Sequence, residues 1–184
     1  ERLDQSMNNR VESKYCLQMD IKKYYPSINH QILKDIYRRI FKDPNLLWLI
    51  DEIIDSTVGN VGIPIGNYLS QWSGNIYLAY FDHWMKEQMK CSYYHRYMDD
   101  IVILNNSKDY LHNLKEEISE YLKETRKLKV KGNWQVFPTK VRGIDFLGYR
   151  FFGDYTLLRK NTAKKFKRKM TKLKNKKQLN KSDY

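Results

Sequence analysis

The sequence is poor in cysteine, and this excludes disulfide frameworks and cysteine-rich zinc sites. Its two cysteines, Cys16 and Cys91, lie far apart and match no metal-ligand spacing. The histidines do not supply the missing ligands, because they are scattered at His30, His83, His95 and His112. Unpaired cysteines suit a reducing compartment, so we expect a cytoplasmic protein in which Cys16 packs inside a sheet as a small apolar residue.

Long apolar runs, internal repeats and Gly/Ser linkers are also missing. No segment approaches the roughly 20 apolar residues of a membrane-spanning helix, and no signal peptide is visible at Glu1. We therefore expect no membrane partner. Without a linker, the 184 residues predict one domain, or one domain with part of a second.

Positive charge, by contrast, is abundant. The chain has 34 Lys and Arg against 21 Asp and Glu, a formal charge of +13, which predicts a polyanionic partner. Hydrophobic residues at 41% and aromatic residues at 14% are enough for a core, so the chain is not a disordered basic arm. After Leu158 the charge is densest, and we expect a basic helix there. Such a helix can bind phosphates, or it can present a solvated face followed by a disordered tail past Asn175.

Two adjacent carboxylates form the most informative motif. Asp99 and Asp100 stand between an aromatic run that ends at Tyr97 and the β-branched run 101–104, a pattern of two short strands joined by a charged turn. Neighbouring carboxylates repel each other, so a rigid turn that holds both is stabilised by a hard divalent cation such as Mg²⁺. An ordinary solvated turn is the alternative, because aspartate is common in turns.

A third carboxylate follows an alternating strand pattern. Apolar residues alternate with polar or small ones over 15–21, which predicts a strand with one buried face. Asp20 falls at the end of that strand, where a side chain can reach a cleft. The alternatives are that Asp20 caps the following turn or pairs with Lys22 or Lys23.

A glycine-containing loop lies between these carboxylates in the sequence. Gly, Pro, Gly and Asn within residues 62–67 predict a tight loop in which Gly66 lets a ligand come close to the backbone. The loop leads into a predicted amphipathic helix at 69–90, whose apolar face comprises Leu69, Trp72, Ile76, Ala79, Tyr80 and Trp84. A plain helix-entry loop is the alternative.

The whole pattern predicts an α/β succession of the α+β type, with helices covering one face of an antiparallel sheet. A helix at 30–42 is expected to begin with Asn29 as its cap. The other expected elements are helices at about 45–57 and 108–125, a hairpin at 93–104, and strands at 128–137 and 143–152.

Three sequence features together resemble the palm domain of reverse transcriptases. They are Asp20, the aromatic Tyr25 five positions later, and Tyr-Met-Asp-Asp at 97–100. The resemblance implies that Asp20, Asp99 and Asp100 are catalytic and, with Ile21, hold two Mg²⁺ ions, for which Mn²⁺ can substitute. In this chemistry a primer 3′-hydroxyl attacks the α-phosphate of a nucleotide, and two ions roughly 4 Å apart stabilise the attacking and leaving oxygens. Tyr25 is expected to pack under the nucleotide sugar and to disfavour a 2′-hydroxyl.

The same resemblance assigns nucleotide binding to the loop and the start of its helix, at Ile65, Gly66, Ser70 and Gln71. Most reverse transcriptases carry Gln-Gly-x-x-x-Ser-Pro here, whereas this chain has Ile65 for the first Gln and Gln71 for the Pro. The variant resembles the enzymes of diversity-generating retroelements, which copy RNA with frequent errors opposite adenine. Since Ile65 cannot form the hydrogen bonds of a glutamine, error-prone synthesis is a hypothesis.

Two C-terminal segments resemble the parts of these enzymes that bind primer and template. The first is the string Phe146, Leu147, Gly148 and Tyr149, which matches the segment that positions the primer terminus. The second matches the start of a thumb helix and carries Lys164, Lys165, Lys167 and Arg168.

One departure concerns the group that protonates the leaving pyrophosphate. Relatives often carry a Lys-Thr pair where this chain has Asn133 and Trp134. Lys131 and Lys140 are close in the sequence but do not align, so the general acid stays unassigned.

The resemblance divides the chain into 1–14 as a remnant of the fingers, 15–158 as the palm, and 159–184 as the basic start of a thumb or a tail. Since most of the fingers and thumb is missing, we expect a truncated piece of a larger enzyme, which can be inactive alone. The expected partners are an RNA template, a DNA or RNA primer, a deoxynucleoside triphosphate (dNTP) and a small accessory RNA-binding protein.

The leading interpretation is an RNA-directed DNA polymerase of prokaryotic retroelement type, with a diversity-generating element as first choice. A group II intron or retron enzyme is the runner-up. A palm that binds RNA without catalysis is a different class, although such a protein has no need to keep three repelling carboxylates. A basic architectural protein would explain the charge but not the spacing of the motifs.

Overall fold

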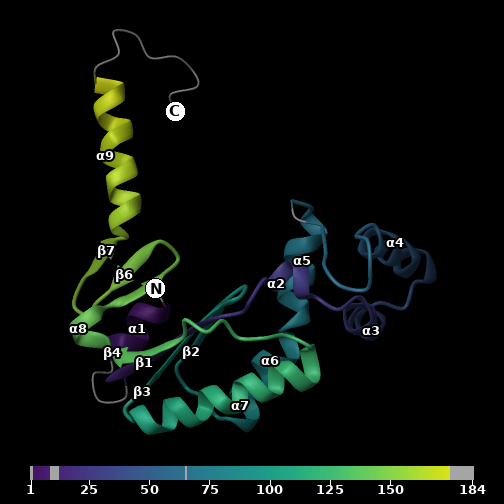
Figure 1. Cartoon of the computed structure of the whole chain (residues 1–184), viewed down its shortest axis with the longest axis horizontal. Coiled ribbons are helices and arrows are strands. Elements are labelled where there is room, and N and C mark those ends of the chain that lie inside the picture. Colours follow the sequence, from purple (N-terminus) through teal and green to yellow (C-terminus); the bar gives the residue numbers. More distant parts are fainter. Residues whose placement is uncertain (1, 9–12, 65, 175–184) are drawn as a thin grey trace.

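The computed structural model describes residues 2–8, 13–64 and 66–174. Its centre is a four-stranded antiparallel sheet in the order β2-β3-β1-β4. Figure 1 shows α7 along one face of this sheet, a group of helices beyond one end of its strands, and a small second sheet from which α9 projects. The predicted α+β architecture with an antiparallel sheet is confirmed.

The central sheet brings together strands that are distant in the sequence. It consists of β1 (Tyr15–Asp20), β2 (Tyr94–Tyr97), β3 (Asp100–Asn105) and β4 (Gln135–Pro138). β1 pairs with both β3 and β4, and in the β1–β3 register Asp20 lies opposite Asp100. Alternation along β1 sends Leu17 and Met19 into one buried cluster and Cys16 into the other, so both faces of the sheet are covered at that point.

The main core extends from the space between the sheet and helix α7 (Lys108–Arg126) into the helices that precede β2 in the sequence. The side chain of Ser107 accepts a hydrogen bond from the backbone of Tyr110 and caps the helix. Apolar residues then recur at helical spacing and are buried against the strands: Leu111, Leu114, Ile118 and Leu122. On the other face, α1 (Arg2–Asn8) contributes Leu3 and Met7 to a smaller cluster.

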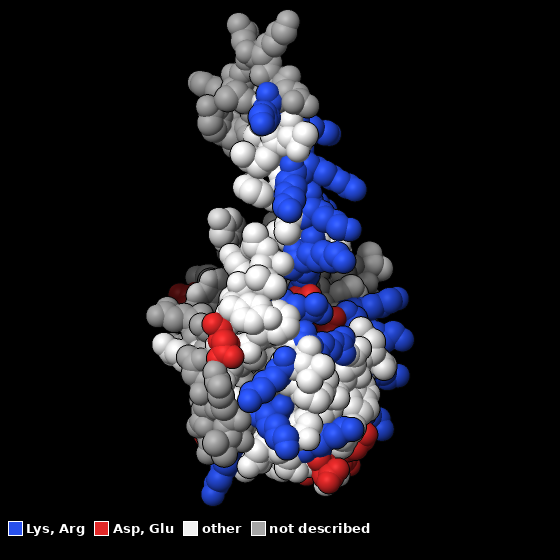
Figure 2. All heavy atoms as spheres, turned by 90° about the vertical axis from the view of Figure 1, so that its left-hand side faces the viewer, with Lys and Arg blue, Asp and Glu red and all other residues white. Residues whose placement is uncertain are grey.

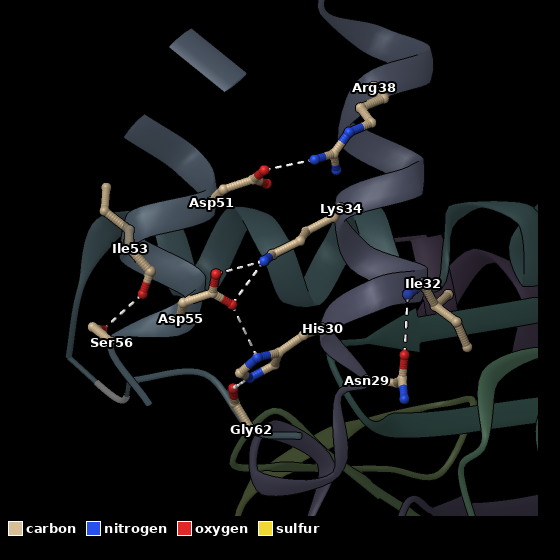
Figure 3. Close-up of polar contacts among 10 residues, drawn as sticks. All are labelled: Asn29, His30, Ile32, Lys34, Arg38, Asp51, Ile53, Asp55, Ser56 and Gly62. Atoms are coloured by element: carbon tan, nitrogen blue, oxygen red, sulfur yellow. Dashed lines mark hydrogen bonds and ion pairs between the residues drawn. The ribbon is translucent and has the colours of Figure 1, made fainter. Parts of the chain in front are cut away.

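A helical region flanks the end of the strands where Asp20 and Asp100 lie (Figure 1). It contains α2 (Tyr24–Ser27), α3 (His30–Ile40), α4 (Pro44–Asp55) and α5 (Tyr68–Tyr77). Asn29 caps α3 through its Oδ1, as the sequence predicted. Figure 3 shows how ion pairs join α3 to α4: Lys34 contacts Asp55 and Arg38 contacts Asp51, each at 2.6 Å.

The predicted single helix at 69–90 is wrong. The chain forms α5, then α6 (Ala79–His83) and a π-helical turn, η1 (Trp84–Gln88), and Leu78 between the first two has φ −99° and ψ 3°. The predicted apolar face is right for Leu69, Ile76 and Trp84, which pack against the core, but wrong for Trp72, which is 67% exposed. The buried face of α5 instead carries small residues at Ser70, Ser73 and Gly74, because the aromatic rings of α2 and α3 pack closely against it.

Two predicted strands also differ from the structure. Over 128–137 only the last residues belong to a strand, and Val130 forms an isolated bridge with Ile21. The segment 143–152 is not one strand but a hairpin of β5 (Ile144–Phe146) and β6 (Tyr149–Phe151), since Leu147 and Gly148 both have positive φ and reverse the chain.

The C-terminal part continues from this hairpin. Helix α8 (Thr139–Arg142) precedes it, and β7 (Thr156–Leu158) pairs with β6 to complete the second sheet. Helix α9 (Lys160–Lys174) follows and buries none of its residues, and its apolar side chains Phe166 and Met170 are at least half exposed. Among the described residues no helix is long and apolar enough to cross a membrane.

Candidate active site

Three aspartates meet at one end of the central sheet. Asp20 ends β1, Asp100 begins β3, and the two are cross-strand partners. Asp99 lies in the short turn between β2 and β3, where Met98 has φ +54°. The backbone N–H of Ile21 donates to the carbonyl of Asp99 at 3.3 Å, which ties the turn to the end of β1. All three aspartates line a hollow of about 420 Å³.

Asp20 is bound by a lysine that is remote in the sequence. Lys131 forms an ion pair with Asp20 Oδ2, and the backbone N–H of Lys131 donates to the Asp20 carbonyl at 2.8 Å. The ion pair thus involves Lys131, whereas the sequence suggested Lys22 or Lys23 as alternatives. The other carboxylate oxygen, Oδ1, is buried and has no hydrogen-bond partner in the described part of the chain.

The neighbouring carboxylates have raised pKa values. Burial is the largest cause of the raised pKa of Asp100, to about 6; a hydrogen bond from Gln18 lowers this pKa, and the charges of Asp20, Asp99 and Asp145 raise it further. Burial is also the largest cause of the raised pKa of Asp99, and the adjacent Asp20 carboxyl group adds to it. The ionised forms are therefore disfavoured here, and a cation in the hollow would stabilise them.

The carboxylate oxygens of the three aspartates are ligands that suit a divalent cation, but they are not arranged as a preformed metal site. Among the described residues no three His, Cys, Asp or Glu side chains form a group ready to hold a metal, and Lys131 occupies one Asp20 oxygen. The unpartnered Asp20 Oδ1 and the raised pKa values of Asp99 and Asp100 leave hard oxygen donors without compensation. Ile21 can contribute only its backbone, because its side chain is buried in the core.

Tyr25 lies between the aspartate turn and α5. Its hydroxyl is 3.5 Å from Met98 Sδ, and a Cβ added to Gly74 would lie 3.3 Å from its ring. The neighbouring Tyr24 hydroxyl donates to the Gly74 carbonyl. Gly74 is thus a residue that the sequence reading missed, and its only signal there is a glycine inside a helical pattern.

The glycine loop is attached to the Tyr25 segment by backbone hydrogen bonds. Gly62 N–H donates to the Ile28 carbonyl at 2.7 Å, and Ile63 N–H donates to the Tyr25 carbonyl at 3.3 Å. Gly66 has φ +97° and open space where a Cβ would stand, so the backbone there is accessible.

The four residues expected to bind the nucleotide lie in different environments. Ser70 is buried and bonds the Pro64 carbonyl, whereas Gln71 is exposed on α5. Ile65 lies outside the described residues, and Gly66 follows it in the loop.

The segment expected to position a primer forms the β5–β6 turn. Phe146 is buried in the smaller cluster, Leu147 and Gly148 make the turn, and Tyr149 is about half exposed. Two ion-paired neighbours that the sequence reading missed, Asp145 and Arg159, line the same hollow as the aspartates.

The basic residues of α9 are exposed. Figure 2 shows Lys and Arg side chains gathered along one side of the projecting helix and continuing onto the body below it. The four that were singled out from the sequence lie on this helix: Lys164, Lys165, Lys167 and Arg168. The arrangement provides an extended positive surface that begins close to the hollow, since Arg159 at the start of α9 lines it.

Comparisons with known proteins give a family for the sequence and similar structures for the fold. The family model described as reverse transcriptase (RNA-dependent DNA polymerase) matches residues 2–151. A search of curated proteins gave no match.

Among solved structures, a truncated apo telomerase from Candida tropicalis superposes with a TM-score of 0.64 at 17% identity, covering 86% of this chain and 38% of the telomerase chain. The same enzyme in complex with a fragment of telomeric RNA gives a TM-score of 0.65 at 15% identity, covering 88% and 32%. Telomerase from Candida albicans, also with a telomeric RNA fragment, gives 0.59 at 13%, covering 86% and 32%.

The chain therefore spans only about a third of the length of these telomerases, and the likeness concerns the fold. The family model, in contrast, extends from α1 through the aspartate motifs to β6. That match covers well over half of the sequence, and the chain belongs to the reverse transcriptase family.

Proposed function

We propose that the chain is the catalytic palm of an RNA-directed DNA polymerase, which transfers a nucleotide from a dNTP to a primer 3′-hydroxyl on an RNA template. The observation that carries this proposal is the pairing of Asp20 with Asp100 across β1 and β3, with Asp99 in the adjoining turn. A fully solvated turn would not place these half-buried carboxylates beside one another, and family membership supplies the reaction class.

Asp20, Asp99 and Asp100, with the backbone of Ile21, would hold two Mg²⁺ ions, and Mn²⁺ could replace them. Ions bound there supply Lewis-acid stabilisation of the attacking and leaving oxygens. The chain itself provides negative oxygen donors on rigid strand ends, which keeps their positions fixed. Lys131 places a positive charge at Asp20 and would move to let a metal bind that carboxylate.

The remaining assignments follow the path of the substrates across the molecule. Tyr25 would form the floor under the nucleotide sugar, and the loop with Ile65 and Gly66 would lie against the base pair, together with Ser70 and Gln71 at the start of α5. The turn formed by Phe146, Leu147, Gly148 and Tyr149 would support the primer end. The basic surface of α9, with Lys164, Lys165, Lys167 and Arg168, would bind the template–primer duplex.

The proposed domain limits remain 1–14 for part of the fingers, 15–158 for the palm and 159–184 for the start of the thumb. The proposed setting is a cytoplasmic retroelement enzyme of prokaryotic type, aided by a small accessory RNA-binding protein. Within that class we favour a diversity-generating element, because Ile65 replaces a glutamine that could hydrogen-bond near the nucleotide. A group II intron or retron enzyme is the alternative.

Primer extension on a defined RNA template tests the proposal. The parent protein is compared with an Asp99→Asn, Asp100→Asn double variant in Mg²⁺, and the cDNA is sequenced. We expect synthesis that disappears in the double variant, with errors concentrated opposite adenine. Accurate synthesis would support the polymerase assignment but reject the error-prone subtype. Equal misincorporation by the unchanged protein and an Ile65→Gln variant would reject the role of Ile65 in fidelity.

A palm that binds RNA without catalysis predicts a different result. RNA binding would then be the same in the double variant and would not respond to Mg²⁺. If no synthesis occurs under any priming condition and RNA binding is unchanged in the double variant, the chain is a non-catalytic RNA-binding protein and the polymerase proposal is rejected.

A further inference from the structure

Arg96 is a buried cation next to the aspartate turn. It lies in β2, two residues before Met98, and its side chain is only 8% exposed. Such a charge is costly to bury unless its donors are satisfied. Arg96 makes three hydrogen bonds that divide between two targets, a carboxylate on α6 and a carbonyl in the turn.

The carboxylate is that of Asp82. Arg96 Nε donates to Asp82 Oδ1 at 2.7 Å and Nη2 donates to Oδ2 at 2.5 Å, a bidentate geometry that only a planar guanidinium can form. The Tyr94 hydroxyl donates to Asp82 Oδ1 at 2.6 Å, so the anion is held from two neighbouring positions of β2. The orientation of the guanidinium is therefore fixed with respect to α6.

The carbonyl is that of Met98. Arg96 Nη1 donates to it at 2.9 Å. Met98 has the left-handed φ of +54° that an L-residue adopts only where its surroundings impose it, and it immediately precedes Asp99. From the other side Tyr25 Oη contacts Met98 Sδ at 3.5 Å. The turn is thus fixed by its backbone to Arg96 and by its side chain to Tyr25.

We propose that Asp82 and Arg96 are positioning residues that hold the Met98–Asp99 turn in the conformation that directs Asp99 towards Asp20. Neither residue contacts a reacting group: Arg96 acts through the Met98 carbonyl and Asp82 acts through Arg96. The inference rests on the proposed polymerase function, because it assigns a task to the turn that carries one of the aspartates.

A structural role alone is the competing explanation, since removing one partner of a buried ion pair is destabilising wherever the pair lies. The chain offers a control for this outside the aspartate turn. Arg38 on α3, whose side chain is 44% exposed, also pairs with an aspartate, Asp51 on α4, and this pair joins two helices (Figure 3). Replacement of Arg38 reports the effect of losing an ion pair elsewhere in the molecule.

The test compares the unchanged protein with Arg96→Lys, Asp82→Asn and Arg38→Lys. Lysine keeps the charge of Arg96 but cannot hold a carboxylate in bidentate fashion and a carbonyl at the same time. Steady-state primer extension gives kcat and the KM for dNTP. The Mn²⁺ affinity is measured separately by electron paramagnetic resonance, which requires no turnover.

Since misplacement of a reacting group by about 1 Å can cost on the order of 100-fold, we expect kcat to fall roughly 10- to 100-fold in Arg96→Lys. The KM for dNTP should stay within about threefold, and Mn²⁺ should bind more weakly. Asp82→Asn should show the same pattern to a smaller extent, because the amide still accepts from Tyr94. Arg38→Lys should change none of these quantities.

The outcomes separate the inference from the function on which it rests. An unchanged protein that makes no product under any priming condition, and whose RNA binding is the same in the Asp99→Asn, Asp100→Asn double variant, overturns the polymerase proposal, whereas the Mn²⁺ affinities still test the positioning role. Equal kcat and equal Mn²⁺ affinity in Arg96→Lys and the unchanged protein overturn the inference, as does an equal loss in Arg38→Lys. Where Arg96→Lys melts below the assay temperature, Asp82→Asn decides by the same criteria.

Discussion

The aspartates at the end of the sheet and those between α3 and α4 differ in whether a neighbouring cation neutralises them. Between the helices Asp55 contacts Lys34 and His30, and Lys34 lowers the pKa of Asp55 (Figure 3). At the sheet end Asp99 and Asp100 have no Lys or Arg ion pair among the described residues, and their pKa values are raised.

The difference shows what each arrangement can do. Charges that neutralise one another between α3 and α4 contribute to the cohesion of two helices and need no ligand. Carboxylates that remain uncompensated reduce the stability of the folded chain, and that free energy becomes available when a cation binds. The four predictions below test this contrast, from the largest expected effect to the smallest.

Replacement of Asp100 by Asn should separate activity from stability. We expect polymerase activity to fall by roughly three orders of magnitude or more, because a metal ligand is lost. The same change removes charge repulsion, so the free energy of unfolding in metal-free buffer should rise. Primer extension and urea denaturation measure the two effects. If Asp100→Asn is inactive because the folded protein is less stable, Asp100 is not an uncompensated, destabilising carboxylate in the metal-free chain.

Replacement of Gly74 by Ala should disturb the contact between α5 and Tyr25. The new Cβ would lie 3.3 Å from the Tyr25 ring, closer than side chains normally pack, so the ring must shift. A misplaced ring should reduce discrimination between deoxy- and ribonucleotides by roughly tenfold, a change of about 1.4 kcal/mol.

The discrimination ratio follows from kcat/KM for a dNTP and the matching ribonucleotide. Gly132→Ala is the control, because nothing lies within 4 Å of a Cβ at that position and its φ is not positive. An unchanged ratio in Gly74→Ala would show that Tyr25 does not depend on this contact.

The stability of the metal-free chain should fall as the pH rises from about 4 to about 6. The pKa of Asp100 is near its ordinary 3.8 in the unfolded chain and about 6 in the folded one, so the folded state binds more protons across this window. The contribution is about 1–2 kcal/mol once partial solvent exposure is allowed for. Urea denaturation at several pH values measures it, and Asp100→Asn should flatten the profile. A rise in the free energy of unfolding over the same pH window would contradict the raised pKa of Asp100 in the folded chain.

Replacement of Lys34 by Met should have the smallest effect. Lys34 donates to both oxygens of Asp55 at 2.6 and 2.7 Å, but the Asp55 side chain is largely exposed, so the pair should contribute less than about 1 kcal/mol. The loss should shrink further in high salt. Thermal unfolding in low and high salt measures it, with Lys42→Met as a control at an exposed lysine that pairs with no aspartate in the described residues.

The sequence was sufficient where local pattern and local structure coincide. Alternating residues over β1, the apolar run of β3 and the spacing of α7 are decided by burial on one face, so these elements were predicted within a few residues. The strand-end position of Asp20 was predicted from the pattern of β1, whereas its approach to Asp99 and Asp100 was expected only from the resemblance to reverse transcriptases.

The errors arose where distant contacts override the local pattern. The exposed position of Trp72 follows from the packing of Tyr25 and Tyr37 against the small side of α5, which involves residues far apart in the sequence. Arg96 likewise appeared as one more cation in a basic chain until its bonds to Asp82 and Met98 were visible. The hairpin at β5–β6 could have been found, because Gly148 is a turn signal inside an apolar run.

The length of the projecting helix α9 limits how many phosphates of a bound nucleic-acid strand the helix can contact. Its 15 residues rise about 22 Å in all, which corresponds to roughly six successive phosphates of one strand at about 3.4 Å each. A duplex lying along this helix would gain contacts with α9 up to that span and none with α9 beyond it. The contribution of α9 to the salt sensitivity of binding should therefore increase with duplex length up to that span and then stay constant.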